Sequence, residues 1–290
     1  MYKIVEKRAL APQIFLMDIE APRVAKSAKP GQFIIIKMDE KGERLPLTIS
    51  DFDAEKGTVT IVVQTIGCST KEMEKYKVGD TFSDFVGPLG QATELMDENI
   101  EDLKKKNIVF IAGGLGTAPV YPQVKWLSEQ GVKADVIIGA KGKDYVIMEE
   151  EMKKVAGNVY PCTDDGSYGY KGLVTNKLKE LVQIEGKKYD LVVAIGPMIM
   201  MKFVCQLTEE LKIATIVSMN PIMVDGTGMC GGCRLTVGGE TKFACVDGPE
   251  FDGHKVDFAE AMRRQTMYKS QEAAKTEGIK PGCGLVGGTK

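Results

Sequence analysis

Ile108-Val109-Phe110-Ile111-Ala112-Gly113-Gly114-Leu115-Gly116-Thr117-Ala118-Pro119 is the stretch that decides the fold. Its opening apolar run predicts a strand buried on both faces, as in a parallel sheet. The glycines then predict a tight turn, and Pro119 suits the first turn of a helix. Backbone amides at such a helix start can approach a pyrophosphate. The motif departs from G-x-G-x-x-G and is weak alone, so a plain strand–helix turn stays open.

Downstream of this stretch, apolar strands and helical patterns alternate. We expect strands at 108–112, 135–139, 159–162, 190–195 and 214–219, and helices at 118–130, 147–155, 173–181 and 198–211. Such alternation predicts a doubly wound parallel sheet.

Two further loops follow strands of this predicted sheet. Asp164-Asp165-Gly166 offers carboxylates that would bind ribose hydroxyls and repel a 2′-phosphate, which favours NADH over NADPH. Lys141 and Lys143 argue the other way, and a capped acidic surface turn is the alternative. Gly196-Pro197-Met198 ends the fourth strand, where we expect it to lie against the nicotinamide.

The first 95 or so residues show a different pattern of apolar residues. Short β-branched runs at 5–10, 14–19, 33–38 and 59–64 predict a small antiparallel barrel, with one helix near 69–76. Arg44-Leu45-Pro46-Leu47-Thr48 combines a cation and a hydroxyl around a rigid proline. Gly67-Cys68-Ser69-Thr70 opens the helix with small residues and free amides, which suits a phosphate. An ordinary strand and an ordinary capped helix are the alternatives.

One compact cluster of metal ligands, Asp225-x4-Cys230-x2-Cys233-x11-Cys245, lies in a glycine-rich segment. Three closely spaced thiolates and a carboxylate suggest an iron–sulfur site, and the glycines allow the backbone to wrap around it. A zinc site with Asp225 or His254 as fourth ligand, or free or disulfide-bonded cysteines, are the alternatives. Competing cluster ligands are Cys205, Asp247 and Cys283.

The composition excludes several classes of protein. A hydrophobic fraction of 43% in 290 residues supports about two domains with real cores. The net charge of −2 leaves no basic excess for nucleic acid. The most apolar run, 191–207, is broken by Gly196-Pro197 and Lys202, so we expect no membrane span. With no visible secretory signal, we expect a cytoplasmic protein with reduced thiols.

Together these motifs resemble the ferredoxin–NADP reductase superfamily, and in it the electron-transfer subunit of dihydroorotate dehydrogenase B. The resemblance assigns Arg44-x-Pro46-Leu47-Thr48 and Gly67-x-Ser69-Thr70 to FAD, and Gly113-Gly114-x-Gly116-x-Ala118-Pro119 and Asp164-Asp165-Gly166-Ser167 to the nucleotide. It implies a flavin barrel at 1–97, an NAD(H) domain at 98–220, a [2Fe–2S] region at 221–255 and a helix with a tail at 256–290. The full set of expected cofactor residues is Arg44, Leu45, Pro46, Leu47, Thr48, Val62, Val63, Gln64, Gly67, Ser69, Thr70, Gly113, Gly114, Gly116, Thr117, Ala118, Pro119, Asp164, Asp165, Gly166, Gly196, Pro197 and Met198.

Asp225 departs from the four cysteines of the dihydroorotate subunits. The Asp-Cys-Cys-Cys pattern resembles the small-subunit family of the NADH-dependent reduced ferredoxin:NADP oxidoreductase, also called sulfide dehydrogenase β subunit. That resemblance implies hydride exchange with NAD(H) through FAD, with single electrons passing by a [2Fe–2S] cluster to a larger flavin and [4Fe–4S] partner in a bifurcating heterodimer. Ferredoxin would be reached through the partner. An electron-transfer subunit of dihydroorotate dehydrogenase B, and a non-catalytic redox-sensing or scaffold module, are the alternatives.

Within this resemblance, roles fall to individual residues. Thr48 would bond near the reactive edge of the flavin, Arg44 would balance phosphate charge, and Ser69 and Thr70 would cap the pyrophosphate. Hydride transfer requires no general base, so no catalytic side chain is expected.

Overall fold

The N-terminal part of the chain is built from antiparallel strands. The computed structural model describes residues 2–272. One sheet has the order β5-β6-β2-β1-β7 and a second the order β4-β3-β8. Alternate residues of β6, Val59, Ile61 and Val63, are fully buried inside this barrel, as the two-residue period of a strand predicts. The elements are β1 (Tyr2–Ala11), β2 (Ile14–Glu20), α1 (Pro22–Ser27), β3 (Phe33–Lys37), β4 (Arg44–Thr48), β5 (Asp51–Asp53), β6 (Thr58–Gln64), α2 (Cys68–Met73), β7 (Thr81–Phe82) and β8 (Asp84–Leu89).

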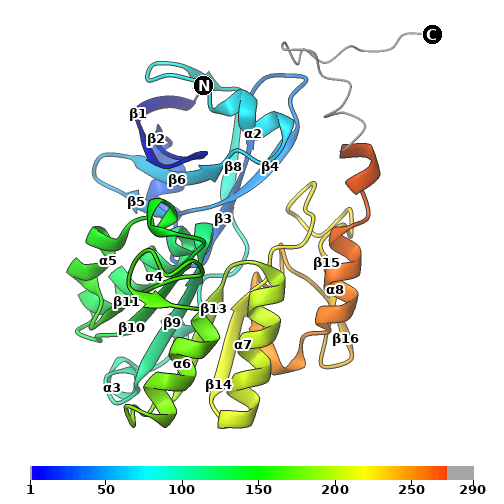
Figure 1. Ribbon diagram of the computed structural model, residues 1–290. Helices are drawn as coiled ribbons and strands as arrows, with labels where there is room; N and C mark the ends of the chain where they lie inside the picture. The colour runs from blue at the N-terminus through cyan, green and yellow to red at the C-terminus, as the bar shows by residue number, and fades with distance from the viewer. Residues whose placement is uncertain (1, 273–290) are drawn as a thin grey trace.

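A seven-stranded sheet forms the second layer of the molecule (Figure 1). Its order is β12-β11-β10-β9-β13-β14-β17, with every pair parallel except β14 and β17. The chain enters at β9 and winds first toward β10 and later toward β13, so the order reverses between β9 and β13. The strands are β9 (Ile108–Gly113), β10 (Asp135–Ala140), β11 (Val159–Thr163), β12 (Tyr170–Lys171), β13 (Leu191–Ile195), β14 (Ala214–Ser218) and β17 (Glu250–Asp252).

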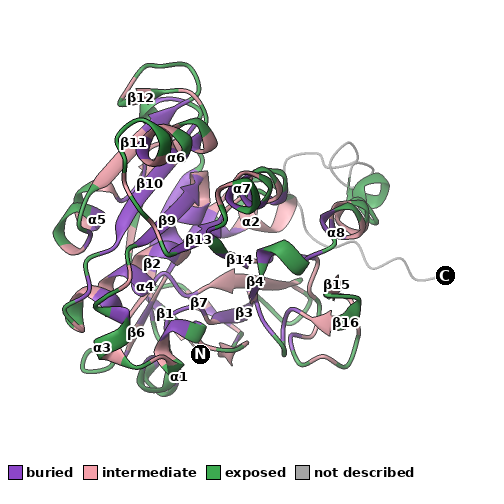
Figure 2. Ribbon diagram, turned by 90° about the horizontal axis from the view of Figure 1, so that it is seen from below, coloured by how far each residue is buried: buried purple, intermediate pink, exposed green. Residues whose placement is uncertain are grey.

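Helices cover both faces of this sheet, and alternate residues of each strand feed the two cores. Phe110 and Val193 pack with the helices of one face, whereas Ile111 and Val192 pack with those of the other. Figure 2 shows the buried residues concentrated in β9, β10 and β13 between the helices. The first face carries α3 (Ile100–Leu103), α4 (Thr117–Glu129) and α5 (Glu149–Val155), and the second carries α6 (Val174–Gln183) and α7 (Met198–Leu211). The short 3-10 turns are η1 (Glu94–Asp97), η2 (Gly114–Gly116) and η3 (Lys143–Tyr145).

The expected [2Fe–2S] region at 221–255 contains regular secondary structure as well as loop. The region holds the hairpin β15 (Arg234–Val237) and β16 (Glu240–Phe243), strand β17 and the turn η4 (Gly253–Lys255), followed by α8 (Phe258–Gln265). Leu235 and Phe258 share a core with Val204 of α7, so this region packs directly on the nucleotide sheet's second face. Figure 1 shows the hairpin and α8 beside α7.

The predicted fold class, a barrel followed by a doubly wound sheet, is confirmed. Helix 198–211 is found with those bounds, but the helix expected at 69–76 ends at Met73. Strand β8 and helices α1 and α3 were not anticipated. Within residues 2–272, no helix is long and apolar enough to cross a bilayer. Cys283 and the tail from residue 273 lie outside the described residues.

Candidate functional site

The Gly113–Gly116 turn connects β9 to α4 at the carboxyl edge of the sheet. Gly114 has φ +54°, and a methyl group placed on Gly116 would lie 2.1 Å from the carbonyl oxygen of Ile195. Thr117 Oγ1 donates to Gly114 O at 3.0 Å and fixes the turn. Gly114 and Gly116 are therefore required for this backbone path.

The Gly196-Pro197-Met198 loop, between β13 and α7, touches the same turn. A methyl group on Gly196 would lie 2.9 Å from Gly113 Cα, whereas the Met198 side chain is buried in the core. The two loops thus meet where the strand order reverses, at the carboxyl ends of β9 and β13. This switch point is where doubly wound sheets bind their ligands.

The acidic loop follows β11, two strands from β9 in the sheet. Hydrogen bonds from the Ser167 side chain and amide lower the pKa of Asp165, so this carboxyl is ionised at neutral pH. Asp165 also lies against the loop after β10, because a methyl group on Gly142 would be 2.6 Å from its Oδ2. Adjacent strands are about 4.8 Å apart, which places the acidic loop about 10 Å from the glycine turn. That separation suits the ribose end of a dinucleotide whose pyrophosphate is at Gly113–Gly116.

The expected flavin strand is β4, and its residues Arg44, Leu45, Pro46, Leu47 and Thr48 are all half-buried. The expected contacts on β6 divide between two environments. Val63 packs inside the barrel core, whereas Val62 packs against Ala118 of α4. The barrel and the nucleotide turn therefore meet at Val62.

The predicted phosphate turn at Gly67 begins the six-residue helix α2. Thr70 Oγ1 accepts bonds from the amides of Ile66 and Gly67 at 3.0 and 3.1 Å. Ser69 Oγ donates to Glu43 Oε2 at 2.5 Å, which ties α2 to the residue preceding β4. The two predicted flavin motifs are thereby adjacent in space.

The cluster loop is defined here as residues 224–233. It holds three of the four predicted metal ligands, and the fourth is Cys245. The four residues form two contacting pairs. Cys233 Sγ and Cys245 Sγ are 3.2 Å apart and both cysteines are buried. The amide of Cys230 donates to Asp225 Oδ2 at 2.7 Å. The amide of Cys245 points at Cys233 Sγ, and the amide of Gly232 at Cys230 Sγ, each at 3.4 Å.

This donor set fits a two-iron cluster. Three thiols and one carboxylate make four ligands, the number that a [2Fe–2S] cluster takes from a protein, two on each iron. Amides directed at sulfur tune the potential of such a cluster. Within residues 2–272, no group of three or more His, Cys, Asp or Glu side chains is already arranged around one metal position. Backbone bonds, first from Thr227, lower the pKa of Asp225 and keep it anionic. Burial and the neighbouring Cys233 raise the pKa of Cys245, so this thiol is protonated at neutral pH and a metal that binds there would displace its proton.

Three of the competing ligands contact other groups in this structure, and the fourth, Cys283, lies outside the described residues. His254 Nε2 lies 3.0 Å from Thr208 Oγ1 of α7. Asp247 Oδ2 accepts from the Phe243 amide at 2.6 Å, and Cys205 is buried in the α7 core.

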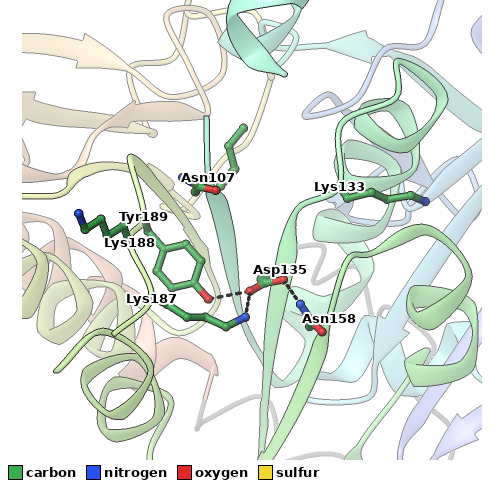
Figure 3. Close-up of a pocket in the computed structure, with 8 residues that line it drawn as sticks. Asn107, Lys133, Asp135, Asn158, Lys187, Lys188 and Tyr189 are labelled. Atoms are coloured by element: carbon green, nitrogen blue, oxygen red, sulfur yellow. Dashed lines mark hydrogen bonds and ion pairs between the residues drawn. The ribbon is translucent and has the colours of Figure 1, made fainter. Parts of the chain in front are cut away.

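A polar cavity of about 300 Å³ lies at the opposite, amino-terminal edge of the sheet (Figure 3). At its centre Asp135 Oδ2 accepts from Lys187 Nζ and Tyr189 Oη, both at 2.7 Å, and Oδ1 accepts from Asn158. These bonds outweigh burial and lower the pKa of Asp135. Asp135, Lys187, Tyr189 and Asn158 are hydrogen-bonded to one another, and the cavity is remote from the carboxyl edge of the sheet. We therefore assign this network a structural role.

Some residues near the site gave no signal in the sequence. Arg264 of α8 donates to Gly232 O, and Glu250 of β17 accepts from Gln123 of α4. Only the packing of α8 beside the cluster loop and the pairing of β17 with β14 bring these groups to their partners.

Comparisons with known proteins agree with this geometry. Residues 220–257 match the iron–sulfur cluster binding domain of dihydroorotate dehydrogenase B, and residues 110–206 match the oxidoreductase NAD-binding domain. A Thermotoga maritima homologue of the dihydroorotate dehydrogenase B (NAD(+)) electron-transfer subunit is 46% identical, covering 93% of this chain and 92% of its own. A Clostridium beijerinckii protein, described as uncharacterized and in the adh 3′ region, is 66% identical over 94% of this chain and 92% of its own.

A solved structure of the NADH-dependent reduced ferredoxin–NADP oxidoreductase, described in connection with flavin-based electron bifurcation, is 44% identical to this chain. It covers 96% of this chain and 97% of its own, with a TM-score of 0.87. An Amycolatopsis cytochrome P450 reductase, 17% identical with a TM-score of 0.60 over 72% of this chain and 65% of its own, shares the fold. The chain therefore belongs to the family of the dihydroorotate dehydrogenase B electron-transfer subunit, as an NAD(H)-linked iron–sulfur oxidoreductase subunit close to the NADH-dependent reduced ferredoxin–NADP oxidoreductase.

Proposed function

We propose that this chain is the small subunit of an electron-bifurcating, NADH-dependent ferredoxin:NADP oxidoreductase. It would bind FAD and a [2Fe–2S] cluster, and exchange electrons between NAD(H) and a larger partner that carries flavin and [4Fe–4S] clusters. The observation that carries this choice is Asp225, paired with Cys230 where the dihydroorotate subunits have a fourth cysteine. The 44% identity to the bifurcating oxidoreductase structure, over nearly the whole of both chains, supports it.

FAD, when bound, supplies the conversion between hydride and single-electron chemistry. The chain's own residues position the reactants. The amides of the Gly114–Gly116 turn would hold the NAD(H) pyrophosphate, and Asp165 would accept from a ribose hydroxyl. Gly196 lets the loop after β13 pack against the Gly113 turn, because a methyl group there would lie 2.9 Å from Gly113 Cα. The nicotinamide would lie beside this loop. On the barrel side, Thr48 and the α2 turn would hold FAD.

Asp225, Cys230, Cys233 and Cys245 would hold the cluster. Amides at Cys245 and Gly232 already point at sulfur, which stabilises thiolate character.

The second candidate is a dihydroorotate dehydrogenase B electron-transfer subunit, favoured by the 46% identity to the Thermotoga maritima homologue. Anaerobic purification of the tagged chain with its natural partner separates the two. A partner with flavin and [4Fe–4S] clusters that reduces NADP⁺ with reduced ferredoxin and NADH supports the proposal. A partner that oxidises dihydroorotate replaces it. A purified chain with no flavin absorbance would support the redox-sensing or scaffold alternative.

A further inference from the structure

Two arginines from distant parts of the chain grip the cluster loop through its backbone carbonyls. Arg44 comes from the barrel and Arg264 from α8. Neither contact follows from the roles considered above, because Arg44 was expected at a flavin phosphate and Arg264 had no assigned role.

Arg44 holds the beginning of the loop. Its Nε donates to Val224 O at 3.0 Å and its Nη2 to Asp225 O at 3.2 Å. The next residue, Gly226, lies so close to the barrel that a methyl group on it would be 2.5 Å from Ile35 Cδ1. Strands β3 and β4 thus fix the peptide units that orient the Asp225 carboxylate.

Arg264 holds the end of the loop. Its Nη2 donates to Gly232 O at 3.1 Å, between Cys230 and Cys233. Its Nε is buried and has no hydrogen-bond partner within residues 2–272. Arg264 as a whole is half-buried, but a buried cationic donor without an acceptor is costly unless negative charge lies nearby. The four ligands of a bound cluster would provide such charge.

We propose that Arg44 and Arg264 are positioning residues that clamp the cluster loop and raise the reduction potential of its cluster. The inference rests on the proposed [2Fe–2S] site. Reduction adds negative charge to an already anionic cluster, so two fixed cations next to its ligands stabilise the reduced form more than the oxidised form. Each cation removed should therefore lower the potential.

The test compares R44Q, R264Q, R44K and R264K in the full chain, with R23Q as a matched control on the exposed face of α1. Iron, labile sulfide and FAD are counted per chain, the EPR spectrum of the dithionite-reduced protein is recorded, and the potential is measured by anaerobic redox titration. We expect both glutamine variants to shift the potential downward and alter the EPR line shape. The lysine variants should recover part of the potential, because charge remains, but not the line shape, because the planar fork is lost. R23Q should match the wild type.

Iron loss from a folded glutamine variant also supports the clamp. Wild-type potential and line shape in both glutamine variants at full iron content would overturn it. If R44Q loses FAD while the cluster potential stays unchanged, the Arg44 half is wrong and that side chain serves the flavin. Failure of the proposed function has a different signature, because the wild type itself would then lack iron and sulfide.

Discussion

The buried carboxyl of Glu250 predicts that the folded chain becomes less stable as the pH rises through neutrality. Its Oε1 accepts from Gln123 Nε2 at 2.5 Å, while its Oε2 is buried and has no hydrogen-bond partner in the described part of the chain. Burial therefore raises the pKa of Glu250 from 4.5 to about 7. The effects of Thr93 and Gln123 oppose this rise, and the negative charge of Glu94 adds to it.

The surroundings of Glu250 also disfavour its charged form. The carboxyl borders a cavity of about 540 Å³, which gives water a route to its proton. The cavity is lined by Glu94, Asp97 and Asp247, with Lys29 as the one basic lining residue. Burial, then the charges of Glu98 and Asp252, raise the pKa of Glu94 as well. Among residues 2–272, no Lys or Arg forms an ion pair with Glu250.

The sign and size of the effect follow from proton linkage. Between pH 4.5 and about 7 the folded chain holds a proton on Glu250 that the unfolded chain has released. Its contribution to stability is complete below pH 4.5 and is lost as the pH rises through 7. Each tenfold change in proton affinity is worth about 1.4 kcal/mol, so at most about 3 kcal/mol is lost by pH 8.

Replacing Glu250 with Gln tests this reasoning, because Gln mimics the protonated acid at every pH. We expect the Tm of E250Q minus that of the wild type to rise by about 6 °C between pH 5 and pH 8. Circular dichroism at saturating FAD measures both proteins. E129Q, an exposed change on the same helix as Gln123, serves as the control and should give no such trend. A difference between E250Q and wild type that stays constant from pH 5 to pH 8 would refute the argument.

Three further predictions follow from the same structure. Asp225→Cys should keep the cluster but shift its reduction potential and remove the pH dependence of that potential, because a thiolate replaces a protonatable ligand. Redox titrations at several pH values that give the same potentials for D225C and the wild type would contradict this. Gly116→Ala should destabilise the chain by about 3 kcal/mol and abolish NADH binding, since the new methyl group would lie 2.1 Å from Ile195 O. A wild-type denaturant midpoint together with a wild-type Kd for NADH would refute the close approach. Asp135→Asn should lower the Tm by several degrees through loss of the Lys187 ion pair and leave the Kd for NADH unchanged, and calorimetry showing weaker NADH binding would contradict a structural role for that network.

The fold could be predicted where local sequence determines local structure. The five-residue apolar runs of β9 and β13 indicated buried strands, because continuous apolar runs are typical of strands covered on both faces of a parallel sheet. The ligand spacing from Asp225 to Cys245 likewise identified the metal region before any geometry was known. The hairpin of β15 and β16 was missed although Gly238 and Gly239, both with positive φ, provide the usual two-residue turn.

Contacts between distant polar groups could not be predicted. Arg44 and Asp225 are 181 positions apart, and Gln123 and Glu250 are 127 apart. A single sequence shows that these side chains are polar. It does not show which partner each side chain will contact once the barrel, the sheet and the helices have packed together. The position of Arg44 illustrates this limit, since its motif suggested a phosphate and the structure gives it two carbonyls of the cluster loop.

The sheet order explains why one chain can join a nucleotide loop to a metal loop. Strand β14 is parallel to β13, so it ends at the same carboxyl edge as the Gly113 and Gly196 turns. The chain leaves β14 at Ser218 and runs directly into the cluster loop, then returns along β17, where Glu250 pairs with Ser218. The barrel covers this edge, touching α4 through Val62 and the cluster loop through Ile35. A flavin held by the barrel would therefore lie between the proposed hydride donor and the proposed single-electron acceptor without any further element, which is the arrangement that a two-to-one electron converter requires.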